Sequence, residues 1–324
     1  MLLVGAFTRP GSAQQLKAVI STFVIKLLRA YGLHAPWGAG RLFALRLVRT
    51  FSALFTPISI RTNGGPRFEV DINDPLYDEL LLYGLHEPRE SSVIRRVIHA
   101  GMTSFDIGAN YGWYTMLFSQ LVGQDGKVFA FEPMPPMYEK LQATLAANNN
   151  PANSHALPLA LGDSISEVSL YRFDALPGSH SSMSTLGRHD FVEYHARMTT
   201  LDAWCIERAL IDRVDFIKCD VEGAELSVLN GSSRMTSTKS PPVWMFELND
   251  ETSAALGYRP SDLVLLLRER FGYRRFYLVR GTTTDACLVP MQSPDKYING
   301  DNVLCIPETR WYTLRESLQP LERP

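Results

Sequence analysis

A glycine-bearing turn between a predicted strand and a predicted helix holds the first residues that could bind a ligand. The strand covers residues 103–107 and contains Asp106, and an apolar stretch of helical character begins at Trp113. Gly108 and Gly112 both lie in the connection. A side chain at either glycine would hold the polar atoms of a ligand off the backbone and keep the helix away from its strand. The turn is therefore a candidate ligand-binding loop.

A second acidic residue, Glu132, ends the next predicted strand at residues 128–131 and is followed by Pro133. In a doubly wound fold, a carboxylate at the tip of the second strand, about twenty residues after the turn, binds the hydroxyls of a ribose. The alternative is an ordinary strand–turn–helix connection whose glycines serve packing alone. Because Asp106 and Glu132 both stand in register with the glycines, the pattern favours a nucleoside-binding half-domain.

The turn departs from the dinucleotide-binding fingerprint in a way that indicates a different nucleoside. Asn110 stands where the middle glycine would be, and the Asp106 carboxylate would repel a pyrophosphate but suit an ammonium. S-adenosylmethionine carries an ammonium, a sulfonium and a ribose, and no phosphate. The residues expected to bind it are Asp106, Gly108, Asn110, Gly112, Glu132 and Pro133, with Leu161 at the end of the third predicted strand and Asp220 of the motif described next.

A second motif, Lys218-Cys219-Asp220-Val221-Glu222-Gly223-Ala224-Glu225, joins another predicted strand to a helix. Together with residues 105–115, 131–133, 200–202 and 245–247, it resembles the FkbM-type family of methyltransferases dependent on S-adenosylmethionine. The segment 83–88 is also similar to that family. The resemblance covers roughly residues 75 to 250. It rests on two acidic motifs, residues 106–110 and residues 218–225, which are specific only in combination. It implies a class I methyltransferase fold: a doubly wound, mostly parallel seven-stranded α/β sheet.

Methyl transfer to oxygen requires an acceptor placed in line with the methyl group and a base that removes its proton. Asp220, at the end of the fourth predicted strand, is the first candidate for that base, and Glu247, at the end of the fifth, is the second. Lys218 leaves its strand on the same face as Asp220. It would hold Asp220 ionised or contact the acceptor itself.

The remaining acidic residues of this region leave two alternatives open. Glu222 and Glu225 flank the start of the following helix, where carboxylates also stabilise a helix N-terminus. Asp220, Glu222 and Glu247 could instead gather magnesium or calcium. Nothing in the sequence fixes their convergence, so no metal site is predicted.

The acceptor class comes from the family resemblance and not from any single residue. It implies a small-molecule or glycan acceptor: a hydroxyl of a sugar, a glycoconjugate or a polyketide-type metabolite. N- or carboxyl-methylation on the same fold is the competing activity, and a non-catalytic, membrane-recruited binding module is the competing class. The polar segment 174–186 is predicted to be either a substrate-side lid or a plain surface loop.

Composition is that of a globular protein able to bury a sizeable core, with 324 residues, 45% of them hydrophobic and 20% charged. The four cysteines form no C-x-x-C pair, which argues against a disulfide scaffold and a zinc site. A reducing compartment and a cytoplasmic location are expected, with peripheral association with a membrane as an open possibility.

Charge is distributed very unevenly along the chain. Residues 1–68 contain nine Lys and Arg and no Asp or Glu, so all 34 acidic residues lie in the remainder. The apolar runs at 16–29 and 42–51 are interrupted by basic residues, which argues against a spanning helix and a secretory signal. We expect two domains: a basic amphipathic helical extension, 1–68, and a methyltransferase domain, 69–324.

The extension has three possible roles. It could be a helical cap, an interfacial helix pair that contacts an anionic membrane through residues 14–60, or a processed leader. No nucleic-acid partner is expected, because the extension lacks aromatic residues interleaved in strands and the predicted catalytic part is acidic.

Overall fold

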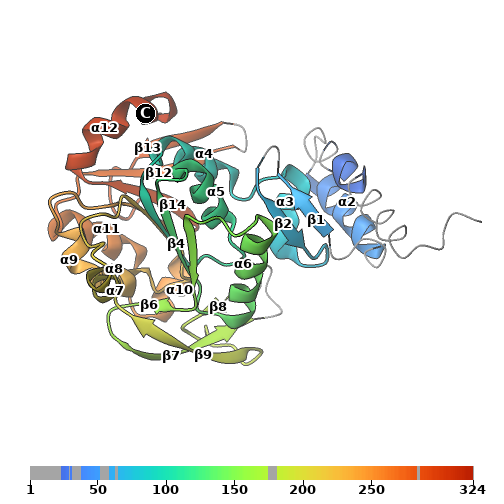
Figure 1. Cartoon of the computed structure of the whole chain (residues 1–324), viewed down its shortest axis with the longest axis horizontal. Helices are drawn as coiled ribbons and strands as arrows, with labels where there is room; N and C mark the ends of the chain where they lie inside the picture. Colours follow the sequence, from blue (N-terminus) through green and yellow to red (C-terminus); the bar gives the residue numbers. More distant parts are fainter. Residues whose placement is uncertain are drawn as a thin grey trace, which may run out of the picture. The chain divides into compact units, whose positions relative to one another are not determined.

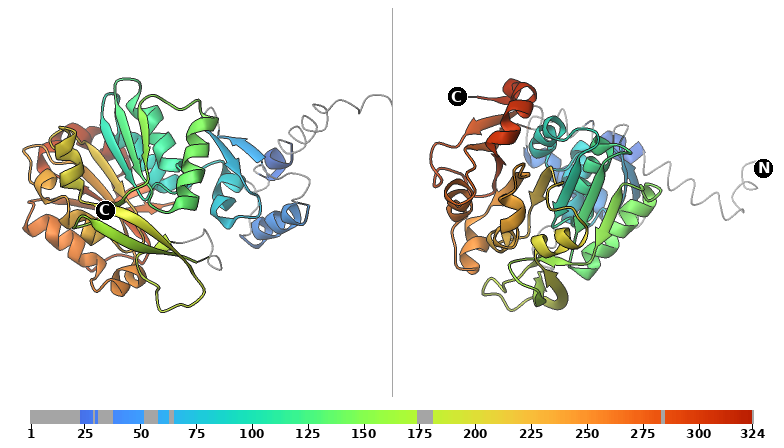
Figure 2. Two further views of the ribbon diagram at one scale, coloured as in Figure 1. Left: turned by 60° about the horizontal axis from the view of Figure 1, so that its bottom comes forward. Right: turned by 60° about the vertical axis from the view of Figure 1, so that its left-hand side comes forward.

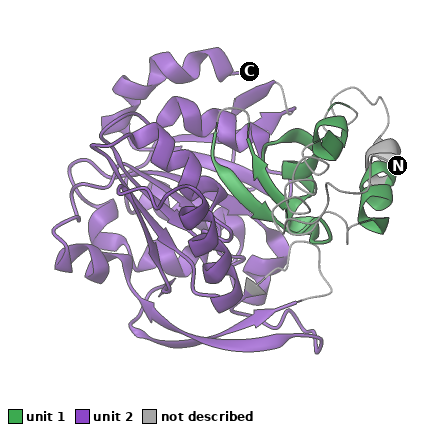
Figure 3. Cartoon of the chain, turned by 45° about the vertical axis from the view of Figure 1, so that its right-hand side comes forward, with its two compact units in different colours: residues 1–86 green, residues 87–324 purple. Residues whose placement is uncertain are grey.

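The computed structural model describes residues 23–28, 30, 38–51, 58–62, 65–173, 181–282 and 285–323. The chain divides into two compact units, residues 1–86 and residues 87–324 (Figure 3). The division therefore lies after His86. The expected boundary after residue 68 falls inside the strand Arg67–Val70, which pairs with the strand Ile58–Arg61.

The first unit contains short helices and one hairpin. Its described elements are α2 (Gly38–Thr50), β1 (Ile58–Arg61), β2 (Arg67–Val70), the 3-10 turn η2 (Pro75–Tyr77) and α3 (Asp78–Tyr83). Arg49, in the last turn of α2, donates to the Ile72 carbonyl at 2.9 Å and pairs with Asp78. In the described part of the chain, we find no helix both long and apolar enough to cross a membrane.

The second unit is built on one large mixed sheet of eight strands in the order β13-β12-β14-β11-β10-β3-β4-β5 (Figure 1). Five strands run parallel in its centre and on one side: β3 (Thr103–Ile107), β4 (Lys127–Phe131), β5 (Ser154–Leu157), β10 (Phe216–Cys219) and β11 (Val243–Leu248). Three antiparallel strands complete it: β12 (Arg275–Gly281), β13 (Ala286–Pro290) and β14 (Asp301–Ile306).

Helices cover both faces of this sheet, as a doubly wound fold requires. One face packs Phe105, Ile217 and Phe246 against the side chains of one helix set: α7 (Leu201–Glu207), α8 (Glu225–Asn230), α9 (Ser233–Thr236) and α11 (Pro260–Glu269). Alternate residues of a strand point to opposite faces. The other face carries α4 (Pro88–Val97) and α5 (Trp113–Val122). The remaining helical segments are α6 (Pro135–Ala147), α10 (Asp250–Ala255), α12 (Glu308–Leu318) and η3 (Gln319–Leu321).

A four-stranded sheet, β6-β9-β7-β8, forms a separate layer that Figures 1 and 2 show apart from the central sheet. Its strands are β6 (Ala160–Leu161), β7 (Ser166–Arg172), β8 (Ser181–Ser182) and β9 (Val192–Thr199). The proposed lid, 174–186, belongs to this region, but residues 174–180 lie outside the described part of the chain.

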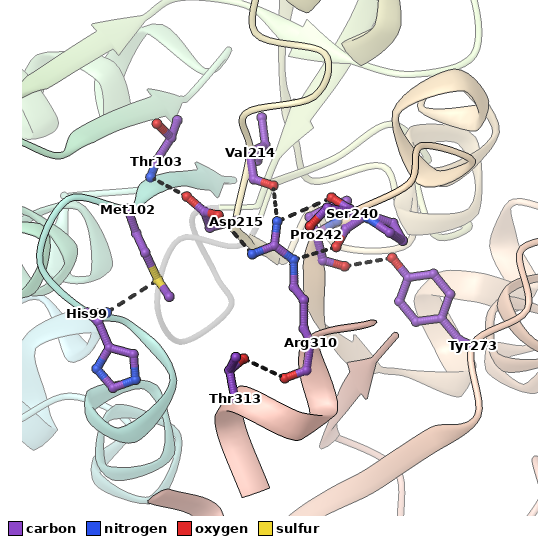
Figure 4. Close-up of polar contacts among 11 residues, drawn as sticks. His99, Met102, Thr103, Val214, Asp215, Ser240, Pro242, Tyr273, Arg310 and Thr313 are labelled. Atoms are coloured by element: carbon purple, nitrogen blue, oxygen red, sulfur yellow. Dashed lines mark hydrogen bonds and ion pairs between the residues drawn. The ribbon is translucent and has the colours of Figure 1, made fainter. Parts of the chain in front are cut away.

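One arginine of α12 ties the amino ends of three central strands together (Figure 4). The Arg310 guanidinium donates to Asp215 Oδ1 at 2.8 Å, to the Val214 carbonyl at 3.1 Å and to the Pro241 carbonyl at 2.6 Å. Asp215 Oδ2 accepts from the Thr103 N–H at 2.8 Å. A single side chain therefore connects the segments that precede β10 and β11 with the start of β3.

The doubly wound α/β expectation is confirmed, with one strand more than the seven predicted. The additional strand, β13, pairs only with β12 at the edge of the sheet. It is short and ends in Pro290, so its sequence gives a weak strand signal. All four cysteines are free thiols, and Cys205, Cys219 and Cys305 are buried.

Candidate functional site

The carboxyl ends of β3, β10 and β11 bring the predicted site residues to one edge of the sheet. Asp106 of β3 stands beside Lys218 of β10, and Lys218 stands beside Met245 of β11. Asp220 and Glu247 each lie two residues further along, so continuing this register places them side by side on the same face as Asp106 and Lys218. Sequence reasoning placed them at strand ends, and the register shows that those ends are adjacent.

Gly108 has a structural reason to be glycine that differs from the expected one. Its φ is +82°, and a Cβ there would lie 1.8 Å from the Asp220 carbonyl oxygen. The Gly108 N–H donates to the Phe131 carbonyl at 2.9 Å. The missing side chain therefore lets the turn after β3 approach the turn after β10. The sequence pattern alone predicts interference of a Cβ with a ligand or with the following helix instead.

Gly112 serves helix packing. It is the N-cap of α5, has φ of +89°, and a Cβ on it would meet Leu141 Cδ1 of α6 at 2.7 Å. The two glycines thus have different roles: Gly108 joins two strand ends and Gly112 sets the approach of two helices.

The Glu132 carboxylate binds the backbone of two turns, the one that follows β3 and the one that follows β4. One oxygen accepts from the Asn110 N–H at 2.8 Å and the other from the Met134 N–H at 2.9 Å, immediately after Pro133. Burial raises the pKa of Glu132 to about 7, and these two hydrogen bonds oppose the rise. The Oδ1 atom of Asn110 is buried, and no described residue hydrogen-bonds to it. Such an atom is a candidate contact for a ligand donor.

Asp106 fastens α5 to the end of β3. It is buried and accepts a hydrogen bond from Thr115 Oγ1 at 2.5 Å. Burial raises its pKa to about 6, against the opposing effects of Thr115 and the Lys218 ammonium. Leu161, also expected at the cofactor site, is buried in β6 and belongs to the main apolar cluster.

Lys218 and Asp220 form the ion pair that the sequence allowed. The Lys218 Nζ atom lies 2.8 Å from Asp220 Oδ2 and 4.9 Å from the centre of the Tyr114 ring. The Tyr114 hydroxyl donates to Glu87. Burial alone would lower the pKa of Lys218, but the carboxylates of Asp220, Glu87 and Glu247 raise it above its ordinary value.

This geometry separates the two possible roles of Lys218. The ammonium is fully buried, whereas the Asp220 side chain is 26% exposed. Lys218 is therefore suited to hold Asp220 in place rather than to contact an acceptor. Sequence reasoning did not identify Tyr114 and Glu87 as supports of Lys218, although Glu87 lies in the segment that resembles the family.

The surroundings of Glu247 favour its protonated form. Burial and the nearby Asp220 and Glu222 carboxylates raise the pKa of Glu247 to about 9, with Lys218 opposing. These effects favour a protonated side chain. In that form it can donate a hydrogen bond and is a poorer base than its place at the strand end suggested.

Glu225 shapes the acidic turn. Its Oε1 atom accepts from the Val221 N–H at 2.9 Å and the Gly223 N–H at 3.3 Å, and Oε2 accepts from the Tyr258 hydroxyl at 2.9 Å. These bonds occupy both oxygens, which favours the structural alternative for this residue. The described residues contain no group of three or more His, Cys, Asp or Glu arranged to hold a metal ion.

Comparison with known proteins gives a match to the Methyltransferase FkbM domain over residues 106–275. A curated relative, the methyltransferase sdnD of Sordaria araneosa, is 28% identical over 152 residues. That alignment covers 39% of this chain, and the chain spans only 58% of that relative.

Two solved structures are similar at low sequence identity. Methyltransferase FkbM from Methylobacillus flagellatus is 16% identical with a TM-score of 0.37, covering 83% of this chain and 60% of that one. A SAM-dependent methyltransferase from Aquifex aeolicus is also 16% identical with a TM-score of 0.37, covering 71% and 92%. Because the domain match spans more than half of the sequence and contains both acidic motifs, the chain belongs to the FkbM methyltransferase family.

Proposed function

We propose that the chain is an S-adenosylmethionine-dependent O-methyltransferase that acts on a hydroxyl of a sugar, a glycoconjugate or a polyketide-type metabolite. The observation that carries the proposal is the Lys218–Asp220 ion pair at the carboxyl end of β10, next to the turn that Glu132 holds. This places a partly exposed carboxylate where open α/β sheets bind their ligands.

The residues of the turn fit this cofactor. Glu132 lies at the tip of β4, where a ribose diol would approach, and the buried Asn110 Oδ1 can accept from a ligand donor. The nearby Asp106 and Asp220 carboxylates favour a cationic ligand over a pyrophosphate, since Lys218 is already paired with Asp220.

When bound, S-adenosylmethionine supplies a methyl group on a sulfonium, which is already a reactive electrophile. The residues of the chain then have two tasks: to orient the acceptor oxygen and to take its proton. Asp220 takes the proton, and Lys218 fixes the carboxylate at 2.8 Å. Positioning supplies most of the acceleration, and a base adds roughly 10²–10⁴-fold.

The test is incubation of the protein with methyl-labelled S-adenosylmethionine and cell extract, followed by separation into lipid, glycan, protein and small-molecule fractions. We expect label in an ether linkage that survives mild alkali. Label released by alkali would indicate carboxyl methylation, and label recovered on amines would indicate N-methylation. Either of these results would overturn the O-methyl assignment.

The role of Glu132 can be tested by substitution. Glu132→Ala should weaken binding of S-adenosylmethionine by ~1.5–3 kcal/mol, because it removes charge-assisted hydrogen bonds to the ribose and releases the Asn110 N–H. Calorimetry measures the affinity, and thermal unfolding shows whether the variant keeps its fold without the Asn110 and Met134 bonds. Unchanged affinity in a folded Glu132→Ala protein would refute the assignment of this site.

We also propose that the first unit contacts an anionic membrane. Residues 23–28 and α2 expose the same pattern of an aromatic, a base and a leucine: Phe23, Lys26 and Leu27, and then Phe43, Arg46 and Leu47. Ile25 and Leu45 are buried instead. A surface that combines exposed apolar side chains with basic ones suits an anionic lipid headgroup layer.

A double variant tests this contact. Phe43→Ser with Leu47→Ser should reduce recovery with floating phosphatidylglycerol vesicles at least about tenfold, because two apolar side chains no longer enter the lipid. The control is Ile165→Ser, which removes an exposed apolar side chain from the second unit. Recovery should fall as salt rises and be low with neutral vesicles. Equal recovery of the wild type with neutral and anionic vesicles, or none with either, would leave a structural cap as the role of the first unit.

A further inference from the structure

Strand β14 brings a residue to the site that the sequence did not single out. Asn302 of β14 pairs directly with Glu247 of β11 across an antiparallel ladder. Residues directly opposite one another in such a ladder project from the same face of the sheet. Glu247 shares its face with Asp220, so Asn302 extends the same row of polar side chains by one strand.

The amide oxygen of Asn302 is buried and has no hydrogen-bond donor among the described residues. The residue is only 5% exposed, and its Oδ1 atom is buried. Its neighbour Asp301 does have partners, since its Oδ2 atom accepts from Arg280 at 2.6 Å and from the Ile298 N–H at 2.7 Å. Leaving a buried amide oxygen unpaired costs stability. The unpaired Asn302 Oδ1 atom lies on the same face as the Glu247 carboxyl group. We interpret it as an acceptor for a hydrogen-bond donor that a ligand supplies.

We propose that Asn302 and Glu247 form an acceptor-binding subsite for neighbouring hydroxyls of a neutral, polyhydroxylated acceptor. Asn302 Oδ1 accepts from one hydroxyl, Glu247 bonds a second, and Asp220 receives the proton of the hydroxyl that is methylated. This inference rests on the proposed O-methyltransferase function and narrows its substrate class.

Spacing and charge both support the assignment. β10, β11 and β14 are consecutive neighbours in the sheet, and adjacent strands lie ~4.8 Å apart, so one small molecule can touch Asp220, Glu247 and Asn302 together. Burial and the Asp220 and Glu222 carboxylates raise the pKa of Glu247 and favour its protonated form. It can therefore donate to an oxygen while Asn302 accepts. The nearby carboxylates disfavour an acceptor that carries a phosphate or a carboxylate.

Saturation-transfer NMR on the full chain with S-adenosylhomocysteine tests the subsite. The probes are methyl α-D-glucopyranoside, methyl α-D-mannopyranoside and methyl α-L-rhamnopyranoside. We expect saturation transfer to at least one of them in the wild type and a loss of affinity of about tenfold in Asn302→Leu. Ser104→Ala is the matched control, because Ser104 Oγ is also buried and unpaired among the described residues but lies toward the amino end of β3. It should bind the glycosides as the wild type does.

Thermal unfolding gives a second readout that a structural role would not share. If Asn302 is kept for a ligand, Asn302→Leu should unfold at the same or a higher temperature than the wild type, because an unpaired buried amide is removed. Glycoside signals that persist in Asn302→Leu, or are absent from the wild type, would overturn the subsite, as would a lower unfolding temperature with unchanged glycoside binding. A wild type that fails to bind S-adenosylhomocysteine would instead refute the proposed function itself.

Discussion

Asp220→Asn is expected to lower turnover at least ~10²-fold while the affinity for S-adenosylmethionine stays within a few-fold. The substitution keeps the shape of the side chain and removes the charge that takes the acceptor proton. It also removes the carboxylate from the Lys218 ion pair at 2.8 Å. Turnover should be measured with labelled cofactor and the acceptor fraction found in the extract experiment, and affinity by calorimetry.

Two measurements keep this prediction free of a folding artefact. The thermal unfolding of Asp220→Asn shows whether the buried Lys218 ammonium, left without its carboxylate, destabilises the fold. Glu207→Gln removes an exposed charge of α7 instead and should retain most activity. Turnover that survives in Asp220→Asn would mean that positioning alone carries catalysis or that Glu247 is the base. A wild type active only with added magnesium would support the metal alternative.

The sequence predicts those parts of the site that depend on neighbours in the chain. The turn from Gly108 to Gly112, the acidic end of β4 and the Lys218–Asp220 spacing are local patterns. Their positions follow from where strands end. The Lys218–Asp220 contact was predictable because residues two apart in a strand share a face.

Other contacts depend on which strands become neighbours, and a single sequence does not give this information. Asn302 reaches the site only because β14 returns antiparallel beside β11. Tyr114 lies over Lys218 because α5 crosses that face of the sheet. Gly108 illustrates the same limit. The sequence identifies the glycine, but it does not reveal that the nearby Asp220 carbonyl leaves no room for a side chain there.

The raised pKa of Glu247 also depends on tertiary structure. In the sequence Glu247 is a carboxylate at the end of a strand and thus a candidate base. In the fold it is partly buried beside Asp220 and Glu222, and both this burial and the like charges favour its protonated form. Its expected task therefore changes from accepting a proton to donating a hydrogen bond.

Arg310→Met should lower the free energy of unfolding by ~2–4 kcal/mol, although Arg310 lies far from any predicted site residue in the sequence. The variant keeps the aliphatic part of the side chain but leaves Asp215 without its charged partner at 2.8 Å. It also leaves the Val214 and Pro241 carbonyls without this donor. Urea denaturation measures the loss, and thermal unfolding checks it independently.

The control for Arg310 lies on the same helix. Arg315 is exposed, and Arg315→Met should change stability by no more than about 0.5 kcal/mol. Because the Arg310 cluster ties the amino ends of β3, β10 and β11, whereas the candidate site lies at their carboxyl ends, the folded Arg310→Met protein should bind S-adenosylmethionine as the wild type does (Figure 4). Equal stability losses in the two variants would mean that the cluster is no more than a surface ion pair. A large loss confined to Arg310 would show that α12, which lies outside the residues matched by the family, holds the strands that position the site.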